Sequence, residues 1–259
     1  MIDYGLTDKV AIVTGGSDGL GRATAKLLAS EGAKVVIGAL SDGPSQEVVD
    51  GIVARGGQAS RIRTDVSSRE DCRNLVKHAV DAFGTVDIVV HNAAHVSHGA
   101  IDVLPEDELD TTFKSGVYAC FWLTRDALPY LEKSKGGRVL VTSSTTGISQ
   151  AHMGLPHYSA VKSAINGFVR GAGLELARRG VTVNAVAPGM TLGHHILTHS
   201  TQEQRDAMAA TIPIPRAAEP IEQAQGFLYL ASDDASYVTG HVLVIDGGSI
   251  LGKPGALFN

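Results

Sequence analysis

Residues 10–30 read VAIVTGGSDGLGRATAKLLAS, and this stretch decides the fold. Val10 to Thr14 form a short apolar run, a cluster of glycines follows from Gly15 to Gly21, and Arg22 to Ser30 carry alanine and leucine at helical spacing. A strand, a glycine-rich turn and a helix in this order let backbone amides approach a pyrophosphate at the positive end of the helix. A plain tight turn is the alternative, but the position at the first strand and first turn favours dinucleotide binding.

Further along the chain, apolar strands alternate with amphipathic helices. We expect strands at 34–39, 59–63, 86–91, 138–143, 181–187 and 242–245, and helices at 45–55, 68–83, 110–131, 158–179 and 220–231. This alternation predicts an α/β fold, a Rossmann-like doubly wound parallel sheet of about seven strands with helices on both faces and ligands at the carboxyl ends of the strands.

No linker, repeat or low-complexity tract divides the chain, so we expect residues 1–259 to form a single dinucleotide-binding and catalytic domain. Residues 190–215 have the least periodic sequence and are predicted to be a mobile lid over the substrate, with an ordinary surface excursion as the alternative.

The composition and charge of the chain limit the classes of partner that it is expected to bind. The chain has a net charge of −5 and 44 % hydrophobic residues, with no clustered Lys and Arg for nucleic acid or an acidic membrane surface. No apolar run reaches the roughly 18 residues of a membrane span, and the first residues do not resemble a signal peptide. Cys72 and Cys120 lie in no disulfide or zinc pattern. We therefore expect a cytoplasmic protein with small-molecule partners, no metal, no membrane contact and no nucleic acid.

A second stretch carries the chemistry. Tyr158 and Lys162 stand four residues apart in the helix predicted to begin at Tyr158, so they share one face. An ammonium beside a phenol favours the phenolate and makes the phenol a usable acid and base. A surface pair is the alternative interpretation of these two residues.

Several motifs in order resemble the short-chain dehydrogenase/reductase family over about residues 6–250. They are Thr14-Gly-x-x-x-Gly-x-Gly21, Asp65-Val66, Asn92-Ala-Ala94, Ser144 with Gly147, Tyr158-x-x-x-Lys162, Asn184-Ala-Val-Ala-Pro-Gly189 and the segment from Tyr237 to Gly248. The resemblance implies that Tyr158 transfers the proton, that Lys162 also binds the nicotinamide ribose, and that Ser144 donates a hydrogen bond to the substrate oxygen. Ser143 competes with Ser144, which has the family's spacing to Gly147.

The resemblance also implies a nicotinamide dinucleotide. The expected cofactor-binding residues are Gly15, Ser17, Asp18, Gly19, Leu20, Gly21, Ser41, Asp65, Val66, Asn92, Ala93, Ala94, Tyr158, Lys162, Pro188, Gly189 and Thr191. Glycine is more usual than Ala94 at its position.

The choice between NAD and NADP depends on the end of the second strand. Ala39 supplies neither the acid that binds the ribose hydroxyls of NAD nor the base that binds the 2′-phosphate of NADP. Asp18 stands where NADP-type relatives often have a cation, and no Lys or Arg lies between Lys34 and Arg55. We therefore favour NAD(H), while a hydrogen bond from Ser41 to a phosphate would allow NADP(H).

One family residue is missing, because Gly116 occupies the position at which the family usually has a catalytic asparagine. That asparagine is thought to hold a water through its main-chain carbonyl, which glycine retains. A local kink, room for substrate and drift at a tolerant position are the three interpretations.

The candidate substrate residues are His95, His152, Met153, His157 and Met190. Ordinary polar loop residues and a metal site are the alternative interpretations of the histidines. Segments 92–113, 139–161 and 180–204 contain neither Lys nor Arg, although a buried anionic substrate would need a cation. The sequence thus favours a neutral, medium-sized, partly apolar alcohol or ketone.

The favoured function is an NAD(P)-dependent short-chain alcohol dehydrogenase or ketoreductase. A 3-oxoacyl-thioester ketoreductase that uses NADPH and a non-catalytic dinucleotide-binding regulator are the alternatives. By resemblance, the two helices at 110–131 and 158–179 would form the contacts of a homodimer or homotetramer, and the tail at 252–259 would cross a subunit contact.

Overall fold

The computed structural model describes residues 3–252, apart from the side chains of His194 and His195. The strands of this part of the chain form one parallel sheet in the order β3-β2-β1-β4-β5-β6-β7. They are β1 (Val10–Thr14), β2 (Lys34–Ala39), β3 (Gln58–Arg63), β4 (Ile88–His91), β5 (Gly137–Thr142), β6 (Val181–Pro188) and β7 (Val242–Ile245). The predicted α/β fold with a seven-stranded parallel sheet is confirmed.

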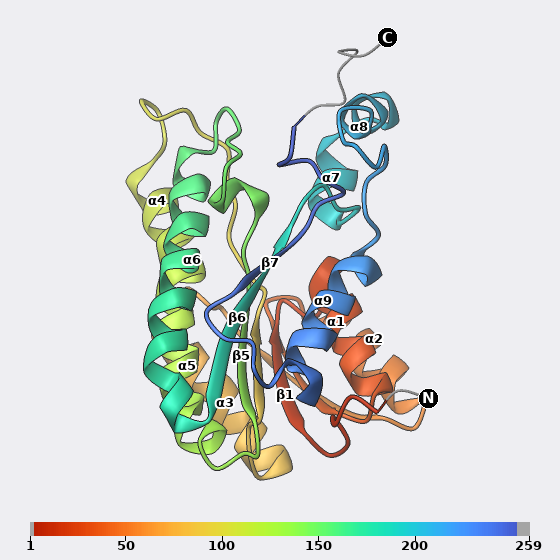
Figure 1. Ribbon diagram of the computed structural model, residues 1–259, viewed down its shortest axis with the longest axis vertical. Helices are drawn as coiled ribbons and strands as arrows, with labels where there is room; N and C mark the ends of the chain where they lie inside the picture. Colours follow the sequence, from red (N-terminus) through yellow and green to blue (C-terminus); the bar gives the residue numbers. More distant parts are fainter. Residues whose placement is uncertain (1–2, 253–259) are drawn as a thin grey trace.

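Helices cover both faces of the sheet (Figure 1). One face is covered by α1 (Gly19–Ser30), α2 (Asp42–Val53) and α9 (Pro220–Ala231), and the other by α3 (Arg69–Phe83), α5 (Ala119–Leu131) and α6 (Pro156–Leu176). All of β1 is buried, so apolar residues follow one another along that strand instead of alternating. Each face thereby has its own apolar core.

The prediction of one regular helix over 110–131 is wrong in its start and in its regularity. It begins earlier, as α4 (Glu106–Phe113), passes through a π-helical turn (Lys114–Tyr118) and continues as α5. Pro105 precedes α4, and acidic residues fill the first turn of this helix, where the helix dipole favours them. The π-helical turn leaves the apolar spacing on both sides intact, so periodicity did not reveal it.

Other helix ends moved by a few residues. α2 begins at Asp42, three residues before the predicted start. α6 begins at Pro156, which suits the first turn of a helix because proline has no N–H to leave unpaired. It ends at Leu176, and a 3-10 turn (Ala177–Arg179) continues to Gly180 in the left-handed conformation.

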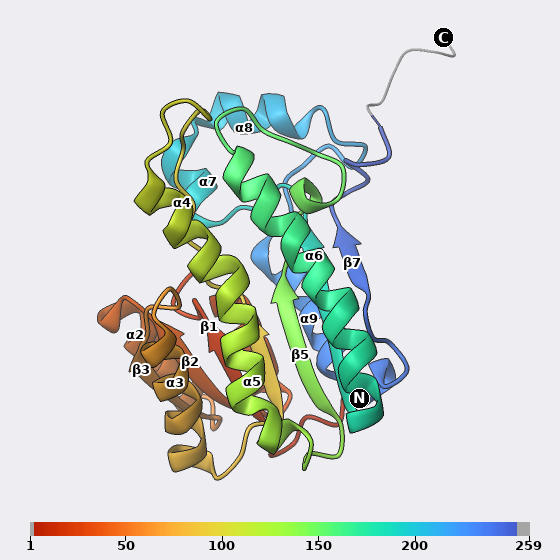
Figure 2. The ribbon, with the colours of Figure 1, turned by 90° about the vertical axis from the view of Figure 1, so that its left-hand side faces the viewer.

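Residues 190–215 contain two short helices, α7 (His194–His199) and α8 (Gln202–Ala209). Thr201 and Gln204 form a capping box at the start of α8. Figure 2 shows α7 and α8 at the end of the molecule to which the arrowheads of β5 and β7 point. This segment therefore lies at the carboxyl ends of the strands, where a lid would have to be.

Residues 253–259 lie outside the described residues, and with them almost all of the tail for which we predicted a subunit contact. Within residues 3–252, no helix has both the length and the apolar character needed to cross a membrane.

Candidate active site

The strand order reverses between β1 and β4, which are neighbours in the sheet although β2 and β3 lie between them in the chain. Such a reversal opens a crevice at the carboxyl ends of the strands. The loop after β1 runs into α1 at this point, and the loop after β4 lies beside it. The Thr14 hydroxyl ties the two loops together by accepting hydrogen bonds from the backbone N–H groups of Asn92 and Ala93, each at 3.0 Å.

The loop after β1 requires its glycines. Gly15 and Gly19 have φ values of +65° and +51°, in the left-handed region that glycine tolerates best. A Cβ atom at Gly21 would overlap the carbonyl oxygen of Gly15. The backbone therefore turns tightly at the start of α1, as a pyrophosphate site at a helix N-terminus requires.

A cavity of about 520 Å³ extends from this turn along the ends of β1, β2, β3 and β4, and we call it the strand-end cavity. Ten of the predicted cofactor residues line it: Gly15, Ser17, Ser41, Asp65, Val66, Asn92, Ala93, Ala94, Tyr158 and Lys162. The extent of this cavity along the strand ends and the glycine turn at its edge fit a dinucleotide.

A second cavity, of about 710 Å³, lies between the end of β5 and α8, and we call it the apolar cavity because most of its exposed wall is apolar. Of the other seven predicted cofactor residues, four line the apolar cavity and three line neither cavity. Leu20, Pro188, Gly189 and Thr191 line the apolar cavity, whereas Asp18, Gly19 and Gly21 line neither.

Tyr158 lines both cavities, as does Thr142 at the end of β5. The Lys162 ammonium is buried on the strand-end side, where it donates a 2.7 Å hydrogen bond to the carbonyl oxygen of Thr142 and lies 5.4 Å from the centre of the Tyr158 ring. Ser144 lines the apolar cavity. The three predicted catalytic residues thus lie in the order Lys162, Tyr158, Ser144 from one cavity to the other.

The two adjacent serines point different ways. Ser143 donates a 2.6 Å hydrogen bond to the Asn166 side chain in the interior. The Ser144 hydroxyl accepts a hydrogen bond from the backbone N–H of Thr146 at 3.1 Å, so its proton remains available to the cavity. This arrangement favours Ser144 over Ser143 as the substrate-binding serine.

His91, at the end of β4, is buried and lies near Lys162. Its Nδ1 contacts the Thr14 hydroxyl at 3.0 Å and its Nε2 contacts the Ser115 carbonyl oxygen at 2.9 Å. Burial, together with the positive charge of Lys162, lowers the pKa of His91 to about 4. The imidazole is therefore neutral at physiological pH and is structural.

Gly116 lies in the π-helical turn, packed against α6. A Cβ atom there would overlap Cγ1 of Val161, the residue that precedes Lys162. Any side chain at position 116, asparagine included, would have to displace Val161. The glycine is thus matched to its neighbour, and the interpretation as drift at a tolerant position does not fit this packing.

The five predicted substrate residues do not all reach a cavity. His152 and Met190 line the apolar cavity, and His95 lines the strand-end cavity. Met153, in the turn before α6, is fully exposed and lines neither cavity. His157 is buried, and its Nε2 bonds to the Ser97 carbonyl oxygen at 3.1 Å, so it secures a loop.

Sequence reasoning missed two contributions to the site. Glu108 pairs with His95, and the hydrogen bond from His95 lowers the pKa of this carboxyl. Ala207, Met208 and Thr211 of the 190–215 segment line the apolar cavity. The helical spacing of Ala207 and Thr211 was the one available signal.

The chain is similar to known proteins over almost all of its length. The family model described as enoyl-(acyl carrier protein) reductase matches residues 15–249. The chain is 37 % identical to versicolorin reductase stcU of Emericella nidulans, over 95 % of this chain and 97 % of the relative. It is 35 % identical to the 3-oxoacyl-[acyl-carrier-protein] reductase FabG of Vibrio cholerae, over 94 % and 98 % of the two chains. It is 34 % identical to the 7alpha-hydroxysteroid dehydrogenase of Clostridium sardiniense, over 96 % of each.

A solved structure also matches: a short-chain dehydrogenase from Burkholderia cenocepacia in complex with NADP, with a TM-score of 0.89 and 34 % identity over 95 % of this chain and 99 % of that one. The present chain belongs to the short-chain dehydrogenase/reductase family. It is accordingly an NAD(P)-dependent oxidoreductase.

Proposed function

We propose that this enzyme interconverts a secondary alcohol and a ketone on a neutral, medium-sized, partly apolar substrate. The observation that carries the proposal is the position of Tyr158, which lines both the strand-end cavity and the apolar cavity. A group that transfers a proton during hydride exchange has to reach both the cofactor and the substrate. Among the three catalytic candidates, Tyr158 is the one that does so.

The cofactor supplies or accepts the hydride when it is bound. The Tyr158 hydroxyl gives the proton to the carbonyl oxygen in reduction and takes it from the alcohol in oxidation. The Lys162 ammonium, held by the Thr142 carbonyl, stabilises the phenolate that remains after reduction. Ser144 donates a hydrogen bond to the substrate oxygen as negative charge develops there.

The substrate class follows from the wall of the apolar cavity. Among the residues that the structure describes, the lining of this cavity includes no Lys, Arg, Asp or Glu, and it includes Leu20, Met190, Ile196, Met208 and Ile212. An anionic substrate would lose its hydration here without gaining a cationic partner. The relatives named for versicolorin and for a hydroxysteroid support a substrate of this kind. Residues 190–215 would then serve as the lid that excludes water.

The decisive variant is Tyr158→Phe, with Tyr237→Phe as a control because the Tyr237 side chain is fully exposed. With a panel of neutral and anionic alcohols and ketones, we expect Tyr158→Phe to lower kcat by at least about 10²-fold and to leave cofactor binding in place. Tyr237→Phe should behave as the wild type. Turnover by Tyr158→Phe at the wild-type rate would contradict the mechanism, and a strong preference for anionic substrates would contradict the substrate class.

For the cofactor we propose NAD(H). Lys162 is the one Lys or Arg among the lining residues of the strand-end cavity, and it is bonded to Thr142. Near the end of β2, Arg61 is paired with Asp42, so it is not free for a 2′-phosphate. A solved relative holds NADP, so NADP(H) is the alternative, with Ser41 of the strand-end cavity as its phosphate contact. NADH should raise the Tm more than NADPH at equal concentration, and the opposite order would overturn this choice.

A second candidate is reduction of a 3-oxoacyl thioester with NADPH, and the similarity to two proteins named FabG favours it. The acyl chain would occupy the apolar cavity, and the carrier's phosphate would remain outside near Arg125 or Arg170. Acetoacetyl thioester reduction that outpaces every neutral ketone in the panel would establish this function instead.

We also propose a homodimer or homotetramer. Tyr118, Phe121 and Leu174 are exposed large apolar residues beside and on α5 and α6. Gly167 and Gly171 of α6 have open space where a Cβ would be, so another helix could approach closely. Sedimentation equilibrium of the wild type and Leu174→Glu tests this, and a monomeric wild type would contradict it.

A further inference from the structure

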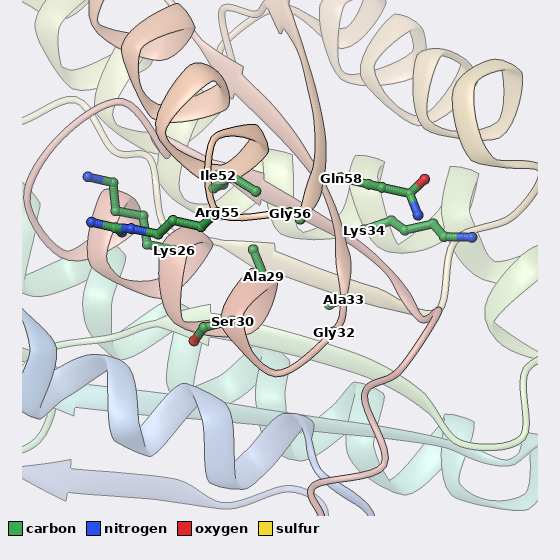
Figure 3. Close-up of a pocket in the computed structure, with 11 residues that line it drawn as sticks. Lys26, Ala29, Ser30, Gly32, Ala33, Lys34, Ile52, Arg55, Gly56 and Gln58 are labelled. Atoms are coloured by element: carbon green, nitrogen blue, oxygen red, sulfur yellow. The ribbon is translucent and has the colours of Figure 1, made fainter.

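The opposite edge of the sheet holds a third cavity, of about 380 Å³, at the amino ends of β2 and β3 (Figure 3). The ends of α1 and α2 and the turns that follow them enclose it. Its wall includes the basic side chains of Lys26, Lys34 and Arg55, with Ala29 and Ile52 as apolar surface between them. None of its lining residues is acidic.

Two of these cations have no partner within residues 3–252. The side chains of Lys26 and Arg55 make no hydrogen bond or ion pair there, and Figure 3 shows both extending in the same direction. Burial and the neighbouring charges of Arg22 and Arg55 lower the pKa of Lys26, and the carboxylate of Glu47 counteracts this only in part. The positive charge at this end of the cavity is thus not neutralised by the protein itself.

Lys34 differs from the other two, because it forms a 2.9 Å ion pair with the exposed Asp8. In Figure 3, Lys34 and Gln58 extend away from Lys26 and Arg55. The cavity therefore has one end with two unpaired cations and one end whose cation is already paired.

Helix capping does not account for the two free cations. Cations near a helix C-terminus are often explained by the carbonyl groups left without partners there. Here backbone groups already occupy these carbonyls: Gly32 N–H bonds to the Ala29 oxygen at the end of α1, and Gly56 N–H bonds to the Val53 oxygen at the end of α2. The side chains of Lys26 and Arg55 bond to none of these carbonyls within residues 3–252.

We propose that this cavity binds a phosphorylated small molecule with an apolar body. The Lys26 ammonium and the Arg55 guanidinium bind the phosphate oxygens, since both groups form strong charge-assisted hydrogen bonds with phosphate. The body of the ligand covers Ala29 and Ile52. A volume of about 380 Å³ lies in the range of small-molecule sites and leaves room for more than a phosphate.

This site is separate from the catalytic one. β2 begins at Lys34, which lines the third cavity, and ends at Ala39, which lines the strand-end cavity. Six residues of strand span roughly 17–20 Å, so one molecule of modest size does not reach from one cavity to the other. The phosphorylated ligand and the dinucleotide therefore bind at the same time.

The test uses the full chain at low ionic strength, saturated with NADH or NADPH so that the dinucleotide site is filled. Phenyl phosphate is titrated by calorimetry, with inorganic phosphate and benzyl alcohol as probes of the two halves of the ligand. We expect saturable binding of phenyl phosphate that is tighter than that of phosphate alone, and no binding of benzyl alcohol. Lys26→Gln and Arg55→Gln should each weaken it about tenfold.

The matched control is Arg73→Gln/Lys133→Gln, which removes the same charge from exposed sites elsewhere. It should bind phenyl phosphate as the wild type does, and all variants should keep wild-type affinity for the dinucleotide. Two results would overturn the proposal: no saturable binding to the dinucleotide-saturated wild type, or equal binding by Lys26→Gln/Arg55→Gln and the control.

Discussion

The buried imidazole of His91 joins the ends of β1 and β4 to the π-helical turn. The Thr14 hydroxyl already accepts two backbone N–H groups, so its own hydrogen points to Nδ1 of His91. Nε2 then carries the ring proton and donates it to the Ser115 carbonyl oxygen. Both ring nitrogens are satisfied in the neutral form, whereas a second proton on Nδ1 would face the hydroxyl hydrogen and the nearby Lys162.

The lowered pKa of His91 predicts how the free energy of unfolding depends on pH. An unfolded histidine takes up a proton near pH 6.5, but the pKa of folded His91 is about 4. The unfolded state therefore binds more protons between these values, and the free energy of unfolding falls as the pH is lowered through them. The full effect amounts to roughly 3 kcal/mol. Urea unfolding at several pH values from 7 to 4 measures it.

His91→Gln should be less stable at pH 7 but should lose much of this pH dependence, since glutamine does not titrate. His241→Gln is the control, because His241 is exposed. If His91→Gln shows the same slope as the wild type, another group is responsible for the loss of stability.

At the scale of elements, the π-helical turn and α6 are fitted to each other through Gly116 and Val161. Adding a methyl group by Gly116→Ala should lower the free energy of unfolding by about 1–3 kcal/mol, because its Cβ would overlap Val161 Cγ1. Gly51→Ala, in α2 with open space around its Cβ, should stabilise the protein by up to about 1 kcal/mol. Urea unfolding of both variants makes the comparison.

The double variant Gly116→Ala/Val161→Ala separates this contact from a general intolerance at position 116. The smaller side chain at 161 leaves room for the added methyl group, so the two changes should be less costly together than the sum of the single changes. Strictly additive losses would show that Val161 is not what requires the glycine.

Strand positions could be predicted well from the sequence, because strands buried on both faces need continuous apolar runs. β2 and β7 have the bounds that the sequence predicts, 34–39 and 242–245. Helix ends were harder, since α4 begins in a polar stretch whose helical start depends on Pro105 and the acidic residues after it. The π-helical turn depends on a contact between Gly116 and Val161, which lie 45 positions apart in the printed sequence, and no local pattern encodes such a contact.

At the scale of the whole molecule, the positions of the catalytic candidates follow from the order of the motifs, because the carboxyl ends of parallel strands meet at one edge. Ser144 follows β5, and Tyr158 and Lys162 lie near the start of α6, so the topology brings them together. Substrate contacts were predicted less well. Met153 and His157 lie in and just after the turn that precedes α6, whose course depends on packing. The Met153 side chain is exposed, whereas that of His157 is buried.

The two cysteines report on the integrity of the whole fold. Both are buried in the same core, between the sheet and α3 and α5, and burial raises the pKa of each thiol to about 12. Since the thiolate is the reactive form, iodoacetamide should not modify Cys72 or Cys120 in the folded protein. As urea is added, both should react together, at the same midpoint as the change in Trp122 fluorescence, because one cooperative core encloses them.

Gln202→Cys is the control, because it places an exposed thiol on α8 that should react at once in the native protein. Modification of Cys72 at a lower urea concentration than Cys120 would mean that α3 detaches before the rest of the molecule unfolds.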